Sequence, residues 1–269
     1  MGKRCTKMIF LCIKQYRDPY YQGIAAQLAF FFMLSIVPTM IVLSQMLGIL
    51  DISLDFLQDW IKQYVDSEMA SALLYLVDYK SVATTNFFLI LMAIWAASRI
   101  HFSLMRVTNY TYSEGTDSGH FWRERARSLL TLVITLLAMT SMIIALMYGE
   151  TIFHALLGLL FDSTALNKVF EMFKWPMAAA IYFLMVSLNY YLLPRVKKKY
   201  REILPGSIFS SVGMMLVTIF YSVYASHAVN YDLIYGSLAS IVALMFWLYF
   251  ISWVLCLGIL VNKAWEDSK

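Results

Sequence analysis

Long charge-poor stretches alternate with short charged segments along the whole chain. A helix that crosses a bilayer needs about 20 consecutive apolar residues, and the regular alternation of apolar and polar positions that is typical of membrane barrel strands is missing from these stretches. The pattern therefore predicts six transmembrane helices, at residues 23–50, 81–105, 127–149, 174–194, 203–229 and 233–262.

Two of the segments between the predicted spans are amphipathic. In residues 51–80 the apolar residues recur at helical spacing and acidic residues fall between them, and residues 151–173 show a similar pattern. An amphipathic helix of this kind lies in the membrane interface with its apolar face towards lipid. We expect both segments to lie on the outer membrane surface, one after the first span and one after the third.

The composition supports an integral membrane protein. Hydrophobic residues make up 61% of the 269 residues, charged residues 14%, and the mean hydropathy is +0.66. A soluble domain is about 25% charged, so the composition disfavours a soluble globule, a disordered chain and a disulfide scaffold. The three cysteines have no spacing typical of a disulfide framework or a zinc site. We therefore expect one all-α polytopic membrane domain over residues 1–269.

The positions of the basic residues predict the orientation of the chain. With the N-terminus inside, nearly all of the 21 lysines and arginines fall on inner segments. Inner segments of membrane proteins carry such an excess of Lys and Arg, so both termini are predicted to be cytoplasmic. The outer segments hold only Lys62, Lys80, Lys168 and Lys174.

The N-terminal segment is too interrupted by charge to be a cleaved signal peptide. Its apolar run from Met8 to Ile13 is followed closely by Lys14 and Arg17, whereas a signal core needs about 7–15 apolar residues. Apolar residues recur there at helical spacing beside basic ones. We therefore expect a short interfacial helix that rests on anionic inner-leaflet lipids.

The predicted spans contain neutral polar residues, and no charged residue lies near the middle of any span. A substrate inside the membrane would then contact neutral side chains, freed backbone carbonyls or helix ends. In the alternative interpretation, the neutral polar residues only pack helices together or bond to their own backbone. Pro38 predicts a kink in the first span, and His101 beside Arg99 is the candidate proton-sensitive group. The candidate substrate-binding or translocation residues are Gln27, Ser35, Pro38, Arg99, Asn109, Asn189, Tyr190, Tyr235 and Ser237.

Sequence signatures of enzymes are missing from the chain. It contains no G-x-S-x-G, Walker, H-E-x-x-H or Rossmann motif. The basic run from Arg195 to Arg201 directly follows a predicted span. Basic residues at this position are more typical of a segment that fixes membrane topology than of a nucleic-acid-binding patch. We therefore expect no enzyme activity, no cofactor, no catalytic or metal site, and no nucleic-acid partner.

Three segments resemble the YihY/BrkB family of bacterial inner-membrane proteins. Residues 25–38 read AAQLAFFFMLSIVP and are similar to the family's first-span stretch, and two later groups resemble its other motifs. After the second span these are Trp95, Ser98, Arg99, Leu104, Met105, Arg106, Asn109 and Tyr112. Near the end they are Tyr235–Leu238, Trp247–Tyr249, Gly258 and Asn262. Pro194 and the pair Pro205–Gly206 also match the family's pattern.

This resemblance implies a six-helix protein of the bacterial plasma membrane with cytoplasmic termini, in agreement with the charge pattern. The family has carried a ribonuclease label, which the residues of this chain do not support. Many relatives have a Glu two residues after the glycine that matches Gly258, and this chain has Leu260 there.

The leading hypothesis is a transporter or exporter of a small solute or lipid-like molecule through a cavity in the helix bundle. The alternative is a structural or scaffolding envelope protein that binds lipid or a partner without transport, and a membrane-embedded enzyme ranks last. The small-residue seams in the spans allow close helix packing, and an oligomer is compatible with them.

Overall fold

The computed structural model describes residues 2–21, 23–49, 58, 74, 91, 94–117, 120–157, 163–227 and 239–268. Within these residues the chain is helical and contains no strand, which confirms the predicted all-α class. The elements are α1 (Gly2–Tyr16), η1 (Pro19–Tyr21), α2 (Ile24–Ile49), α6 (Arg99–Tyr112), α7 (Phe121–Leu157), α8 (Ser163–Leu192), α9 (Tyr200–His227) and α11 (Ala239–Asp267).

Three stretches of the described helices are long and apolar enough to cross a membrane. They are Phe121–Ala145 in α7, Tyr200–Tyr224 in α9 and Ile241–Asp267 in α11. These stretches correspond to the third, fifth and sixth predicted spans. The other three spans, and hence the total of six, stay predictions.

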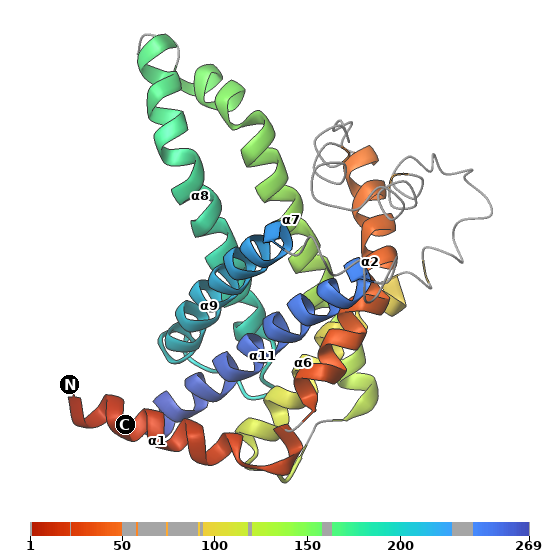
Figure 1. Cartoon of the computed structure of the whole chain (residues 1–269), viewed down its shortest axis with the longest axis vertical. Helices are drawn as coiled ribbons and strands as arrows, with labels where there is room; N and C mark the ends of the chain where they lie inside the picture. Colours follow the sequence, from red (N-terminus) through yellow and green to blue (C-terminus); the bar gives the residue numbers. More distant parts are fainter. Residues whose placement is uncertain are drawn as a thin grey trace.

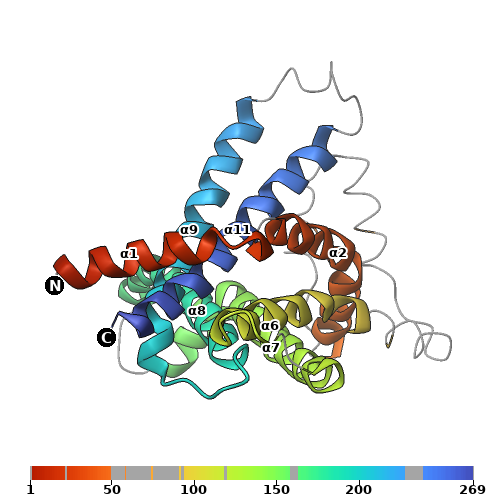
Figure 2. The same ribbon diagram turned by 90° about the horizontal axis from the view of Figure 1, so that it is seen from below.

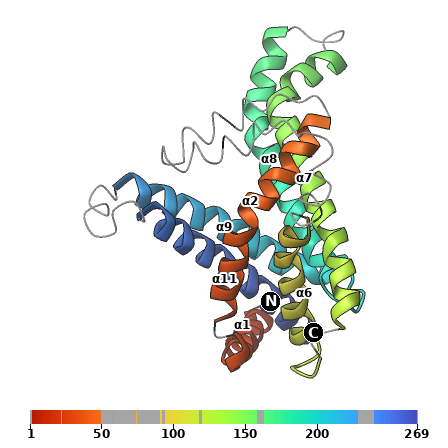
Figure 3. The same ribbon diagram turned by 90° about the vertical axis from the view of Figure 1, so that its right-hand side faces the viewer.

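The helices form two long pairs that diverge from a common base. α7 and α8 run side by side as one pair and α9 and α11 as the other, and the second pair leaves the first at a steep angle (Figures 1 and 3). α1 lies across the base against α11 (Figure 2). The marked ends of the chain lie close together at this base in all three views. If both termini are cytoplasmic, they must lie on the same side of the membrane, and their closeness at the base agrees with this. That the base faces the cytoplasm stays a prediction.

α11 is the central helix of the base because it packs against α9, α2, α1 and α6. The main apolar core gathers buried side chains from all of these helices except α1, and from α8 as well. Leu28 of α2, Met105 of α6, Leu193 after α8, Ile203 of α9 and Leu260 of α11 are completely or almost completely enclosed there. Leu260 of α11 is therefore a core residue of this chain.

Glycines form the tight turns at the base. Gly23, which joins η1 to α2, has a φ of +86°, and Gly115, which follows α6, has the same value. L-residues with a side chain rarely adopt this conformation, so glycine is the natural residue at both turns. After α6 the N–H of Gly115 donates to the carbonyl of Tyr110, and that of Ser113 to the carbonyl of Asn109, which closes the helix end.

Several predicted boundaries differ from those of the helices. The predicted second span, 81–105, contains a turn at Ser98, after which α6 begins at Arg99 and continues to Tyr112. The predicted outer segment 151–173 falls on the end of α7 and the start of α8. The other outer segment, 51–80, lies outside the described residues except for Gln58 and Leu74.

Candidate functional site

α8 carries two of the predicted site residues side by side, but they face different neighbours. Successive residues of a helix point about 100° apart because 3.6 residues make one turn. Asn189 meets Thr135 of α7, whereas the hydroxyl of Tyr190 meets Ser210 of α9 and the carbonyl of Leu255 in α11. The predicted polar residues therefore belong to two separate groups on either side of α8.

The first group joins α6, α7 and α8 through His101, Thr135 and Asn189. We call these three residues the polar triad. Nε2 of His101 lies 3.0 Å from Oγ1 of Thr135, which lies 3.1 Å from Oδ1 of Asn189. The amide nitrogen of Asn189 donates to the carbonyl of Met185 at 2.8 Å, which fixes the orientation of the amide. His101 is only 7% exposed, whereas Thr135 and Asn189 are half-buried.

The hydrogen-bond pattern assigns the proton of the His101 ring. Oγ1 of Thr135 contacts two pure acceptors, Oδ1 of Asn189 and the carbonyl of Thr131 at 2.9 Å. The hydroxyl has one hydrogen to donate, so it must accept its third bond from Nε2–H of His101. Nδ1 then carries a lone pair, and within the described residues this buried atom has no partner.

The second group fastens α8 to α9 and α11. The hydroxyl of Tyr190 lies 2.6 Å from Oγ of Ser210 and donates to the carbonyl of Leu255 at 2.8 Å. One helical turn from Ser210, the N–H of Gly206 donates to Oδ1 of Asn262 at 2.7 Å. These polar atoms are occupied by protein partners, so we assign this group to helix packing.

Asn109 and Arg127 hold the segment that ends α8. Oδ1 of Asn109 accepts a hydrogen bond from the backbone N–H of Arg195 at 3.0 Å. The guanidinium of Arg127 donates to the carbonyls of residues 192–194 and pairs with Glu124 at 2.7 Å. Arg127 thereby satisfies carbonyls that every α-helix leaves free at its C-terminus. Nδ2 of Asn109 is buried and has no partner among the described residues.

The remaining predicted site residues do not join either group. Gln27 is exposed on α2, and the hydroxyl of Ser35 donates to the carbonyl of Phe32 in its own helix at 3.0 Å. Pro38 lies inside α2, and Arg99 is exposed with its guanidinium 5.0 Å from the ring centre of Phe31. Tyr235 and Ser237 lie outside the described residues.

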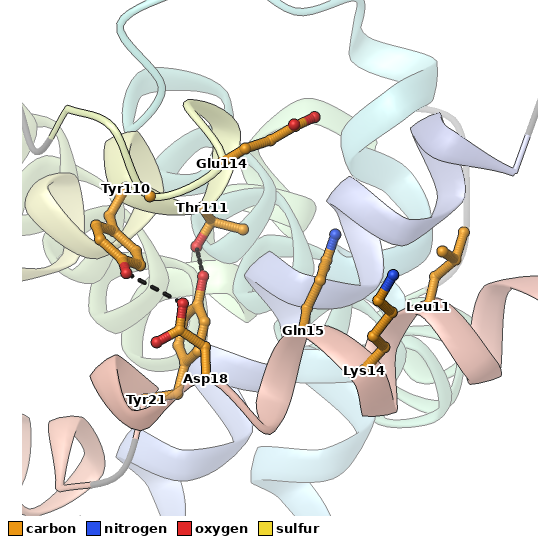
Figure 4. Close-up of a pocket in the computed structure, with 9 residues that line it drawn as sticks. Leu11, Lys14, Gln15, Asp18, Tyr21, Tyr110, Thr111 and Glu114 are labelled. Atoms are coloured by element: carbon orange, nitrogen blue, oxygen red, sulfur yellow. Dashed lines mark hydrogen bonds between the residues drawn. The ribbon is translucent and has the colours of Figure 1, made fainter.

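A separate pocket of about 290 Å³ opens at the base between α1, η1 and the end of α6. Figure 4 shows Lys14 and Gln15 entering it from α1, with Tyr110, Thr111 and Glu114 on the facing segment. We call it the base pocket. Its lining residues are Leu11, Lys14, Gln15, Asp18, Tyr21, Tyr110, Thr111, Glu114 and Gly115.

Hydrogen bonds between hydroxyls and Asp18 shape the floor of the base pocket. The hydroxyl of Tyr110 donates to Oδ2 of Asp18 at 3.0 Å, and Oδ1 accepts the N–H of Tyr20 at 2.9 Å. The hydroxyls of Tyr21 and Thr111 are 2.7 Å apart. Burial raises the pKa of Tyr21 to about 12, and burial together with the bond to Asp18 raises the pKa of Tyr110. Both phenols therefore keep their protons at neutral pH.

None of the seven predicted site residues that the structure describes lines the base pocket. Its lining comes from segments far apart in sequence, and Asp18, Tyr20 and Tyr21 form no recognised motif. The helical spacing of residues 8–16 predicts the α1 wall, but no sequence signal places that wall against the end of α6. Within the described residues, no group of three His, Cys, Asp or Glu side chains is placed to hold a metal ion.

Comparison with known families shows how this chain is related. The sequence model of the virulence factor BrkB family matches residues 12–269. The chain belongs to this family. The resemblance to YihY/BrkB proteins is thereby confirmed, and the chain is a membrane protein of the BrkB and UPF0761 group.

The relatives of this BrkB-family chain include one that matches over nearly its full length. The ribonuclease-like protein YfkH of Bacillus subtilis is 25% identical over 252 residues, which cover 92% of this chain and 91% of the relative. A UPF0761 membrane protein of Pseudoalteromonas translucida is 32% identical over 68 residues, 25% of this chain and 22% of the relative. One of Vibrio cholerae is 29% identical over 115 residues, 40% and 38% of the two chains. No solved structure matches the chain.

The geometry explains several of the family-like residues by packing. A Cβ at Gly206 would collide with the backbone carbonyl of Gly258, and one at Gly258 would collide with the hydroxyls of Ser210 and Tyr190. The two glycines and Asn262 therefore mark a close crossing of α9 and α11 in this BrkB-family chain. The ribonuclease-like name belongs to the relative, and no residue group described in this chain supports catalysis.

Proposed function

We propose that this BrkB-family membrane protein transports a small solute or a lipid-like molecule past the polar triad of α6, α7 and α8. The observation that carries the proposal is the buried Nδ1 of His101, which has no partner among the described residues and lies in the ring that is hydrogen-bonded to Thr135 beside Asn189. A buried acceptor without a partner costs about 1–3 kcal/mol. A substrate that donates a hydrogen bond to Nδ1 would relieve this cost.

The location of the polar triad supports transport because polar side chains inside a membrane are costly and typically mark substrate paths. Thr135 and Asn189 lie inside predicted spans that contain no acidic residue. A path lined by neutral groups recognises its substrate by hydrogen bonds. The proposed substrate is therefore a molecule with hydroxyl or amide donors.

We also propose that the chain crosses the bacterial plasma membrane several times with both termini in the cytoplasm. The basic residues on the predicted inner segments and the shared side of the two chain ends support this orientation. Single cysteines placed at Lys7 and Glu266 of a cysteine-free variant should react with a membrane-impermeant maleimide only after the cells are opened. Labelling of either cysteine in intact cells would contradict the orientation.

The transport proposal is tested by flux into proteoliposomes that contain the purified full-length protein. A panel of radiolabelled polyols, amides and lipid-like alcohols is compared for wild type, Thr135→Val and His101→Phe. Because each variant removes about one net hydrogen bond, we expect the rate for the transported compound to fall roughly fivefold.

Ser141→Ala is the matched control, because Ser141 also lies on α7 but is exposed and its hydroxyl donates to the carbonyl of Leu137 in its own helix. Its flux should equal that of the wild type. If no compound in the panel is transported, or if all variants transport equally, the scaffolding alternative replaces the proposal.

A further inference from the structure

The base pocket has charges of both signs on opposite walls. The ammonium of Lys14 stands on the α1 wall and has no hydrogen-bond or ion-pair partner among the described residues. The carboxylate of Glu114 stands on the facing wall, where it is 79% exposed and only loosely paired with Lys263 at 3.4 Å. Both charges are therefore available to a ligand.

The third charged group of the base pocket, the carboxylate of Asp18, is hydrogen-bonded to neighbouring protein groups. Its two oxygens accept hydrogen bonds from the backbone of Tyr20 and the hydroxyl of Tyr110, so it serves to hold the floor together. The ligand-facing charges are then one cation and one anion. A simple anion would meet the carboxylates of Glu114 and Asp18, and a simple cation would meet Lys14, whereas a zwitterion finds a partner for each of its ends.

The exposed side chains on the outer face of α1 indicate that the zwitterion belongs to a membrane lipid. Ile9, Phe10 and Ile13 are 51%, 67% and 53% exposed, although the opposite side of α1 packs against α11. Lys7 and Lys14 lie together along one edge of this apolar face, next to Phe10. An exposed apolar stripe bordered by basic residues is typical of a helix that lies in the headgroup layer of a membrane. Lys14, on the edge of this face, lines the base pocket, while the other pocket residues of this segment lie further from the face. The Lys14 wall of the pocket therefore borders the headgroup layer.

We propose that the base pocket binds the headgroup of an aminophospholipid, a zwitterion with a phosphate and a primary ammonium. Lys14 holds the phosphate and Glu114 accepts hydrogen bonds from the ammonium, while the outer face of α1 lies among the acyl chains next to the bound lipid. The volume of about 290 Å³ fits a headgroup, since sites for whole drug-sized ligands measure roughly 300–1,000 Å³. The inference goes beyond the transport proposal, because the base pocket and the polar triad share no residue.

The test measures lipid binding to the purified full-length protein by native mass spectrometry. The delipidated protein is titrated with short-chain phosphatidylethanolamine, phosphatidylcholine and phosphatidylglycerol. We expect phosphatidylethanolamine to bind about tenfold more tightly than phosphatidylcholine, because a trimethylammonium has no N–H to donate to Glu114. Phosphatidylglycerol, which has no cation, should bind more weakly than phosphatidylethanolamine as well.

Two variants assign the two ends of the headgroup. Lys14→Gln should weaken phosphatidylethanolamine and phosphatidylcholine alike by about tenfold, because both carry the phosphate. Glu114→Gln should abolish the preference for phosphatidylethanolamine over phosphatidylcholine. Lys14→Gln removes a positive charge and Glu114→Gln removes a negative charge. A general electrostatic effect would therefore weaken lipid binding in one variant and strengthen it in the other. Lys7→Gln, on the same helix but outside the pocket, is the control and should bind like the wild type.

A soluble zwitterion is the rival source of the same chemistry, and free phosphoethanolamine distinguishes the two. If it binds to the wild type as tightly as the short-chain lipid, the pocket serves a soluble ligand and the lipid assignment is overturned. Equal binding of the three lipids, or insensitivity to both Lys14→Gln and Glu114→Gln, would overturn the headgroup site altogether. Flux through the polar triad is measured separately, so a negative result here leaves the transport proposal standing.

Discussion

The polar triad and the base pocket are two polar regions of an apolar protein, and they differ in burial, charge and hydrogen bonding. In the triad His101 is buried and Thr135 and Asn189 are half-buried, and hydrogen bonds join the three neutral side chains. Among the described residues, Nδ1 of His101 has no partner. The base pocket is charged and partly exposed, and two of its charges are available. The comparison teaches that most hydrogen-bonding groups of the polar triad also join helices and leave a single acceptor for a substrate, whereas the base pocket presents two charges to a ligand.

The largest expected effect comes from the ion pair of the half-buried Arg127 with the buried Glu124, which anchors α8. Arg127→Met leaves the carboxylate of Glu124, which is 1% exposed, without its cation, and removes the donor to the carbonyls of residues 192–194. Breaking a buried pair costs about 3–5 kcal/mol, so the apparent melting temperature in detergent should fall steeply. Arg123→Met, an exposed neighbour on α7, should melt like the wild type. Equal stability of the two variants would show that Arg127 is not an anchor.

A smaller loss is expected when the α9–α11 crossing is widened. Gly206→Ala drives a methyl group against the backbone carbonyl of Gly258, which cannot rotate away. Overpacking of this kind costs about 1–3 kcal/mol, measurable by thermal unfolding of the detergent-solubilised protein. Gly213→Ala, on the same helix, meets the side chain of Val254 and should cost less because a side chain can adjust. If Gly213→Ala costs as much as Gly206→Ala, the crossing is not the tightest contact.

The polar triad should show coupling between its two ends. His101→Phe and Asn189→Leu both act through Thr135, so the double variant should lose less stability than the sum of the single variants, by about 1 kcal/mol. The change in unfolding free energy from a double-mutant cycle measures this coupling. Asn189→Leu combined with Ser141→Ala should be additive, and additivity in both pairs would show that the triad does not act as a unit.

The base pocket should respond to alkaline pH through Tyr21. Its pKa is raised by burial to about 12 from an ordinary value near 10, so the folded state holds the proton more tightly than the unfolded chain. The stability from this group is fully present below pH 10 and is lost as the pH rises from about 10 to 12. Tyr21→Phe should flatten this part of the melting curve against pH. An unchanged slope would assign the alkaline loss to other groups.

The smallest stability effect is expected at Lys14. Because its ammonium is exposed and unpartnered among the described residues, Lys14→Gln should change the unfolding free energy by less than about 0.5 kcal/mol. The same variant should weaken lipid binding, as argued above. A large loss of stability in Lys14→Gln would show that the base pocket serves to hold the fold.

The sequence predicted the helical class and the family, but only part of the site. Runs of apolar residues reveal helices because burial in lipid requires them over a fixed length. The same runs did not reveal the turn at Ser98 or the continuation of α7 to Leu157. Asn189 was predicted as a site residue and belongs to the polar triad, whereas Tyr190 and Asn109, predicted with it, hold helices together.

Composition, the periodicity of apolar residues and short motifs are local properties of a chain, and they determined that this protein is an all-α membrane protein of the BrkB family. The tertiary structure alone decided that His101, Thr135 and Asn189 meet, and that Lys14 faces Glu114 across a pocket. The physical reason is that these contacts join residues 34 to 100 positions apart through helix crossings. The angle and register of each crossing depend on side-chain packing between helices, which no single segment encodes.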